Sequence, residues 1–210
     1  MNPNEEQGEF YRELVPRHFN QTLATQRAAA VSGADDARVL EEMEAVRSSI
    51  IVRVETRGAL TRHAFDIDRG EMRYVETPSH APFLILCHTL ADFPNLRREC
   101  GDSLLGFLGG LAGLGDAMRL TSQRVRSLCA LHGSLVFERI GAAGFTLSAH
   151  FGLAAPGPEP QAVIRLDEEV FARLRRGELD PQDAFLEGEV EVEGEVELAI
   201  GLALAALSPE

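Results

Sequence analysis

The pattern of hydrophobic and polar positions changes abruptly near the C-terminal end of the chain. In GEVEVEGEVELAIGLALAAL, residues 188–207, glutamate occupies every second position up to Glu197, and no charge follows for ten residues. The alternation predicts a strand with one face in water, because successive side chains of a strand point to opposite faces. The uncharged stretch predicts a helix that is apolar on every side and therefore buried on every side. One face can pack on a sheet, whereas the other requires more protein, a partner chain or an apolar ligand.

The N-terminal part of the chain is predicted to be helical, and strands are predicted to follow it. Apolar residues recur at helical spacing within residues 5–47, and Pro16 interrupts the pattern, which predicts separate helices. Residues 49–77 hold three strand-like stretches, two of them joined by a tight turn at Arg69-Gly70. The continuous apolar run at 83–90 is typical of a central strand or of the start of a buried helix.

The second half of the chain repeats the order of the first half. Each half has a hairpin, a proline-containing loop, an apolar strand and a short helix, and the helices carry Phe93 with Leu96 and Phe171 with Leu174. Either a degenerate duplication or two unrelated stretches with common patterning would produce this order. We divide the chain into an N-terminal helical segment (1–48), a β-rich half that ends in a glycine-rich linker (49–117) and a C-terminal half (118–210). The glycine-rich linker suits either an apolar lid or a buried helix packed through its glycines.

Charge and composition restrict the class of partner. The formal net charge is −13, and all 20 basic residues are arginine. This balance argues against nucleic acid and anionic lipid surfaces as partners, because both attract concentrated positive charge. The three cysteines have neither disulfide nor zinc spacing, which favours a reducing, cytoplasmic location. The polar N-terminus and the short apolar run at 103–115 predict no signal peptide and no transmembrane segment.

No combination of residues predicts catalysis. Cys87 and His88 are neighbours on a predicted strand and point to opposite faces, so they cannot pair as nucleophile and base. The six histidines have no metal-ligand spacing, and the chain has neither a Gly-x-Ser-x-Gly elbow nor a phosphate-binding loop. We therefore predict a protein without enzymatic activity, catalytic residues, metal or cofactor.

The most specific pattern lies in residues 162–207. Asp167 and Asp180 are each predicted to cap a short helix, and the second of these helices has Pro181 at its first position. Gly194 is predicted to turn the chain into the last helix. The spacing Gly-x-Leu-x-Pro-Gln-x-Ala-Phe-x-x-Gly-x-Val-x-Val-x-Gly, followed by an apolar helix, resembles the C-terminal half of the sterol carrier protein 2 (nonspecific lipid-transfer) family. The matching residues are Gly177, Leu179, Pro181, Gln182, Ala184, Phe185, Gly188, Val190, Val192 and Gly194.

The resemblance implies an α+β sandwich, in which a curved, mainly antiparallel sheet carries helices on one face, here preceded by the N-terminal helices. It also implies an apolar cavity for a sterol, fatty acyl or isoprenoid lipid, walled by the C-terminal helix. Gln182 would then offer a hydrogen bond to a ligand head group or satisfy the end of the preceding turn, and the apolar residues would line the cavity or belong to the core. The candidate ligand-binding residues are Phe171, Leu174, Gln182, Phe185, Val190, Val192, Leu198, Ile200, Leu202 and Leu204.

The chain departs from the family in length, in the absence of lysine and in its acidic strand. Three functions fit these observations. The first is noncatalytic binding or carriage of a lipid or acyl-chain ligand. The second is a structural or interaction module that buries the apolar helix against a protein partner or in a homodimer. The third is an accessory lipid-binding role in quinone or isoprenoid-lipid biosynthesis.

Overall fold

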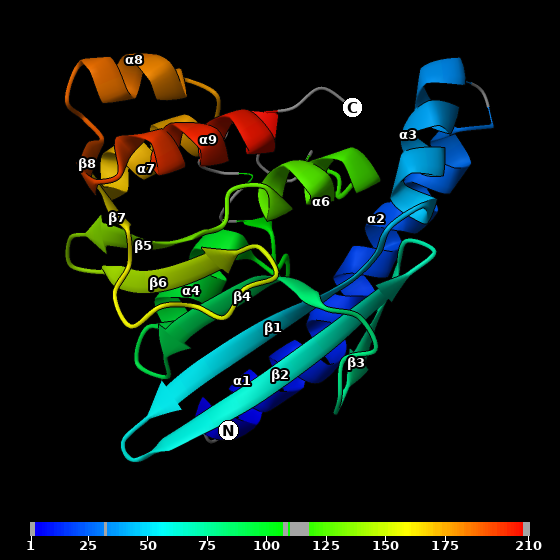
Figure 1. Ribbon diagram of the computed structural model, residues 1–210, viewed down its shortest axis with the longest axis horizontal. Helices are drawn as coiled ribbons and strands as arrows, with labels where there is room; N and C mark the ends of the chain where they lie inside the picture. The colour runs from blue at the N-terminus through cyan, green and yellow to red at the C-terminus, as the bar shows by residue number, and fades with distance from the viewer. Residues whose placement is uncertain (1–2, 32, 107–108, 110–117, 208–210) are drawn as a thin grey trace.

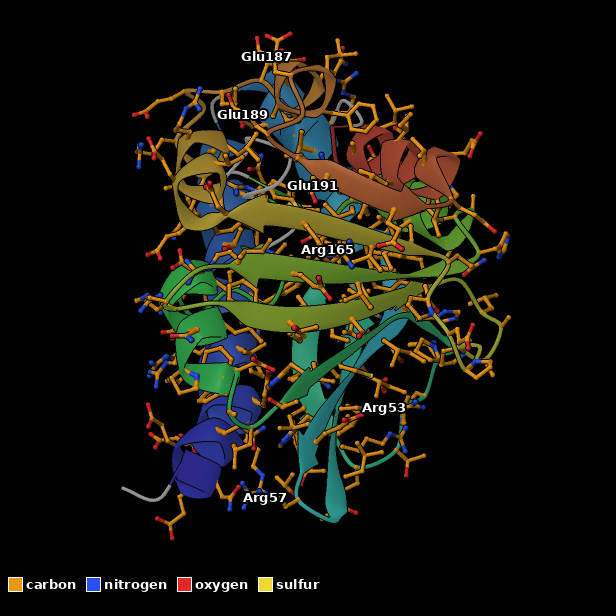
Figure 2. The ribbon with its side chains drawn as sticks, turned by 90° about the vertical axis from the view of Figure 1, so that its left-hand side faces the viewer. Arg53, Arg57, Arg165, Glu187, Glu189 and Glu191 are labelled. Atoms are coloured by element: carbon orange, nitrogen blue, oxygen red, sulfur yellow. The ribbon has the colours of Figure 1, made fainter. Side chains whose placement is uncertain are left out.

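The computed structural model describes residues 3–31, 33–106, 109 and 118–207. It has α+β architecture, with a single mixed sheet and helices packed against one of its faces (Figure 1). The other face carries none of the described helices and is turned toward the viewer in Figure 2. Most of the predicted glycine-rich linker, including residues 107–108 and 110–117, lies outside the described residues.

The sheet contains eight strands in the described part of the chain, in the order β3-β2-β1-β4-β6-β5-β7-β8. Only the β1/β4 and β5/β7 pairs are parallel within this sheet, so the prediction of a mainly antiparallel sheet is confirmed. The strands are β1 (Arg47–Thr56), β2 (Ala59–Asp68), β3 (Glu71–Val75), β4 (Pro82–Thr89), β5 (Gly133–Ile140), β6 (Phe145–Phe151), β7 (Ala162–Asp167) and β8 (Glu191–Gly194).

The N-terminal helices do not separate at Pro16. Helix α1 (Pro3–Glu9), the π-helix η1 (Phe10–Leu14) and α2 (Val15–Ala29) follow one another without a break, and α3 (Ala34–Glu44) comes after the turn. Pro16 lies in the first turn of α2, and the amide of Val15 donates to the carbonyl of Phe10, five residues earlier. A π-turn is wider than an α-helical turn. It accommodates Pro16, which has no N–H, without ending the helix.

The remaining helices are α4 (Phe93–Cys100), α6 (Ser122–Cys129), α7 (Glu168–Arg175), α8 (Pro181–Leu186) and α9 (Val196–Leu207). Side chains cap three of them at their N-termini. Asp167 accepts a hydrogen bond from the amide of Val170, and Asp180 accepts from those of Gln182 and Asp183, as the sequence predicts. Thr121 caps α6 in the same way.

The two halves of the sheet have the same topology. In the first half β1 and β2 form an antiparallel hairpin, β4 lies parallel to β1, and α4 follows. In the second half β5 and β6 form the hairpin, β7 lies parallel to β5, and α7 follows. Strands β4 and β6 pair antiparallel and join the halves into one sheet. The sheet therefore continues across the boundary drawn between residues 117 and 118.

Candidate functional site

A cavity of about 360 Å³ lies between the second half of the sheet and helices α8 and α9. Its floor is formed by Phe137 of β5, Ile164 of β7 and Leu174 of α7. Val190, just before β8, and Val192 within it line one side. The other lining residues come from α8 and α9: Pro181, Gln182, Phe185, Leu186, Val196, Ala199, Ile200, Leu202, Ala203, Leu204 and Ala206.

The register of the sheet brings distant residues together at the floor of the cavity. Ile164 pairs with Phe137 on one side and with Val192 on the other, and all three line the cavity. Because side chains alternate along a strand, Val190 and Val192 share the cavity side and Glu191 takes the opposite face. The valine–glutamate alternation thus supplies one apolar wall and one charged outer surface.

Helix α8 is held over the cavity by its ends. Asp180 caps its N-terminus, and Gly188, with a φ of 75°, reverses the chain after it. The amides of Glu189 and Val190 both donate to the carbonyl of Ala184, at 2.9 and 3.1 Å. These bonds fix the connection between α8 and β8, so that Phe185 and Val190 both reach the cavity.

Helix α9 meets protein on one side and the cavity on the other. Leu198 is buried, and its methyl groups occupy the space beside Gly133 that a side chain there would need. Leu131 packs against Gly201 on the side of α6. On the cavity side, Ile200 and Leu204 line the hollow and remain 47% and 58% exposed.

The mouth of the cavity lies between α8 and α9, because the exposed lining residues all belong to these two helices. Leu186 is 79% exposed, whereas Phe137 at the floor is fully buried. Gln182 is exposed at this mouth, and its side chain makes no hydrogen bond with any described residue. Asp180 accepts hydrogen bonds from the amides of Gln182 and Asp183 at the start of α8.

The structure gathers most of the predicted candidate residues around this cavity, but not all of them. Phe171 and Leu198 are buried in the core and are not among the lining residues that the structure describes. The candidate residues predicted from the sequence did not include Phe137 and Ile164, which only strand pairing brings to the floor. They also did not include Ala199, Ala203 and Ala206, whose small size leaves space beside α9.

The corresponding space in the first half of the sheet is filled by the chain itself. Leu86 and Leu96 are ten residues apart, as are Ile164 and Leu174 of the cavity. Phe10 and Tyr11 of η1 lie over Leu86 and Leu96, and only about 30 Å³ remains between them. The N-terminal helices therefore occupy in the first half the position that is open in the second.

Buried polar side chains lie beneath the N-terminal helices, remote in sequence from the cavity. The Tyr11 hydroxyl is 2.6 Å from Nε2 of His88, and the Gln7 amide nitrogen is 2.7 Å from Nε2 of His63. Burial, followed by the charges of Arg12 and His88, lowers the pKa of His63 to about 4. Burial also lowers the pKa of His88 and raises that of Tyr11. The uncharged forms of these groups are thus favoured in the folded protein.

Acidic residues are concentrated in the segment that contains α8, β8 and the start of α9. From Asp180 to Glu197, both included, the chain has eight acidic side chains and no basic one. Arg173 pairs with Glu189 at 2.6 Å, and Arg165 with Glu193 at 2.7 Å. Figure 2 shows Glu187, Glu189 and Glu191 around α8 and β8 at one end of the molecule, and Arg53 and Arg57 toward the opposite end.

The described residues contain neither a cluster of potential metal ligands nor a helix that could span a membrane. No three side chains of His, Cys, Asp and Glu come together there to hold a metal ion. Among residues 3–31, 33–106, 109 and 118–207, no helix combines the length and apolar character needed to cross a bilayer. Gln182 is the polar member of the cavity lining, so the site can offer apolar surface and one amide.

These features define an α+β protein with an apolar cavity under its C-terminal helix. Residues 131–205 match the SCP-2 sterol transfer family, which confirms the resemblance seen in the sequence for this part of the chain. No curated relative matches the chain at a significant level.

Two solved structures are similar to parts of the chain. Sterol Carrier Protein 2 Like 2 from Aedes aegypti is 21% identical, with 35% of this chain and 72% of that chain covered and a TM-score of 0.28. Sterol Carrier Protein 2 from Yarrowia lipolytica, in its apo form, is 22% identical, with 50% and 95% covered and a TM-score of 0.32.

Proposed function

We propose that the protein is a noncatalytic lipid-binding protein that holds an apolar chain in the cavity between the sheet, α8 and α9. The observation that carries this proposal is the hollow of about 360 Å³, lined almost entirely by apolar side chains. The match of residues 131–205 to a sterol transfer family supports it, because that range contains every lining residue except Ala206.

The size of the cavity favours an acyl or isoprenoid chain. If a methylene group takes roughly the 30 Å³ of a water molecule in the liquid, the cavity holds about a dozen such groups. Moving each of them out of water contributes about 0.8 kcal/mol, so a chain of this length provides the driving force for binding. A longer ligand can extend through the mouth between α8 and α9, where the lining residues are exposed.

Helix α9 takes part in this proposal as a wall. Its sequence has no charge after Glu197, and its two apolar sides have different neighbours: the sheet with α6, and the cavity. An apolar ligand would shield Ile200 and Leu204 from water. The apolar character of the whole helix is then explained by one subunit and its ligand.

Binding of a neutral fluorescent alkyl probe tests the proposal, together with native mass spectrometry of the purified protein. We expect saturable binding and an enhanced emission of the probe. Ala203→Phe places a ring in the cavity and should weaken binding at least tenfold. Ala24→Phe, at an exposed position of α2, adds the same side chain away from the cavity and should bind as the wild type does. No saturable binding, or equal loss in both variants, would contradict the proposal.

A protein interface over the cavity mouth is the second candidate function. It is favoured by the exposure of Leu186, Ile200 and Leu204 on neighbouring helices. Light scattering of the wild type and of Leu186→Ser/Leu204→Ser distinguishes the two functions. An oligomer that dissociates in the double variant, without any lipid in the wild type, would favour the interface.

The cellular role of the protein depends on which lipid the cavity binds and on the compartment in which the protein is located. The three cysteines all lie in the described part of the chain and form no disulfide bond, which fits the proposed cytoplasmic location. An accessory role in quinone or isoprenoid-lipid biosynthesis would use the same cavity. The mass of a co-purified isoprenoid lipid would support that role, and an acyl lipid alone would oppose it.

A further inference from the structure

The charges around the cavity mouth determine which ligand head groups are favoured there. Asp183 on α8 lies three residues before Leu186, the most exposed lining residue, and Glu187 lies one residue after it, at the end of the helix. On α9, Glu197 lies three residues before Ile200 and seven before Leu204, on the same face of the helix. Because neighbouring Cα atoms are about 3.8 Å apart, these carboxylates lie within about one Debye length of the mouth.

None of these three carboxylates is neutralised by a described residue. Asp183, Glu187 and Glu197 are all exposed and form no ion pair within the described part of the chain. The arginines closest in sequence to the lining residues are already paired with carboxylates: Arg165 with Glu138 and Glu193, Arg173 with Glu189, Arg175 with Glu99 and Arg176 with Glu178. The mouth therefore has a negative potential that no ion pair among the described residues offsets.

Among the described residues that line the cavity, Gln182 is the polar one. Its amide is exposed, and it is both a donor and an acceptor of hydrogen bonds. An amide of this kind suits a hydroxyl, ester or amide head group. A carboxylate or phosphate head group would also meet the three unpaired acids at short range.

We propose that this cavity selects lipids by head-group charge: it accepts single-chain lipids with an uncharged or cationic head group and disfavours those with a carboxylate or phosphate. This inference rests on the proposed lipid-binding function and adds the chemical class of its ligand. The apolar cavity binds the alkyl chain of the lipid, and the acidic mouth selects its head group by charge.

Three ligands with the same chain test the selectivity: dodecanol, dodecylamine and dodecanoate. Each competes with the neutral fluorescent alkyl probe at pH 7.5 and at 20 mM and 500 mM NaCl. Dodecanol is used below its solubility limit, and the two charged ligands are used below their critical micelle concentrations. At low salt we expect dodecanol and dodecylamine to bind at least tenfold more tightly than dodecanoate. High salt should reduce this difference severalfold, because screening shortens the range of the repulsion.

Variants link the selectivity to the mouth. Asp183→Asn/Glu187→Gln/Glu197→Gln should bring the ratio of dodecanoate to dodecanol affinity toward unity. The control, Glu9→Gln/Glu55→Gln/Glu76→Gln, removes three exposed acids elsewhere and should leave that ratio unchanged.

The outcomes separate the two proposals. Dodecanoate binding as tightly as dodecanol at low salt overturns the head-group inference and leaves lipid binding intact. A ratio that shifts equally in both triple variants also overturns it, because the effect would then come from net charge. Failure of all three ligands and of the probe to bind would instead overturn the proposed function.

Discussion

Gly194 and Gln161 lie so close together that only glycine fits at position 194. A Cβ atom there would overlap the carbonyl oxygen of Gln161, and the backbone of Gly194 has a φ of 90°, in the region that favours glycine. The same carbonyl accepts a hydrogen bond of 2.8 Å from the amide of Glu195. The glycine that ends β8 thus places the start of α9 against the end of the loop before β7.

Gly194→Ala is therefore expected to destabilise the protein by about 3 kcal/mol, through steric overlap and backbone strain. The matched control is Gly188→Ala, since Gly188 has a φ of 75° and no heavy atom near its missing Cβ. Strain alone should cost this control about 1 kcal/mol. Urea denaturation measures both losses, and equal losses would contradict the role of Gln161.

Leu198 and Leu204 are both on α9 but should respond differently to truncation. Leu198 is 7% exposed and packs beside Gly133, so Leu198→Ala should lower the free energy of unfolding by about 2–5 kcal/mol. Leu204→Ala should change it by less than about 0.5 kcal/mol, because the side chain is exposed. It should nevertheless weaken binding of the alkyl probe by about tenfold, since burying a leucine contributes about 1.5–3 kcal/mol. Unchanged probe binding in Leu204→Ala would argue against a ligand at this wall.

The buried histidines predict a loss of stability in mild acid. The pKa of His63 is lowered to about 4 in the folded protein, mainly by burial, and that of His88 is lowered for the same reason. Between pH 6.5 and pH 4 the unfolded chain therefore binds protons that the folded protein does not. Stability should be complete above pH 6.5 and fall toward pH 4, by at most about 1.4 kcal/mol per pH unit for each histidine.

Chemical denaturation at several pH values measures this slope. His63→Gln/His88→Gln should flatten it, whereas His132→Asn, at an exposed position with a positive φ that asparagine tolerates, should not. In the wild type, the NMR signals of the His63 ring should remain those of the neutral form down to about pH 5. Protonation of His63 near pH 6.5 in the folded protein would contradict the prediction.

Arg139 and Glu99 connect the two halves of the chain. The guanidinium of Arg139 on β5 is 1% exposed and lies 2.7 Å from the carboxylate of Glu99 on α4. Glu99→Gln should destabilise the protein by about 3 kcal/mol, because it leaves the buried guanidinium with only the more distant carboxylate of Glu168, at 3.9 Å, as an ion-pair partner among the described residues. Arg139→Met/Glu99→Gln should lose less than the sum of the two single variants, which a double-mutant cycle in urea measures. Additive losses would show that the pair does not act as a unit.

Local chemistry allowed much of the secondary structure to be predicted. Asp167 and Asp180 cap helices as expected, because an N-cap depends on residues within one turn of it. The helix break predicted at Pro16 was wrong. The effect of a proline depends on the conformation of the preceding turn, and the π-helix at Phe10–Leu14 allows the helix to continue past Pro16. The alternation around Val190 and Val192 correctly separated an apolar side of the strand from a charged one.

The sequence predicted which segments of the chain form the candidate site, but it did not predict all the residues that line the cavity. The sequence alone determined that α9 is apolar on all sides and that Val190 and Val192 share a face. Only the tertiary structure decided that Phe137 and Ile164 form the floor, because strand register joins residues far apart in the chain. It also decided that Leu198 meets protein while Ile200 and Leu204 border a hollow. The physical reason is that an apolar side chain leaves water for packed protein or for a lipid-filled space with a similar gain in free energy, so its pattern in the sequence does not distinguish them.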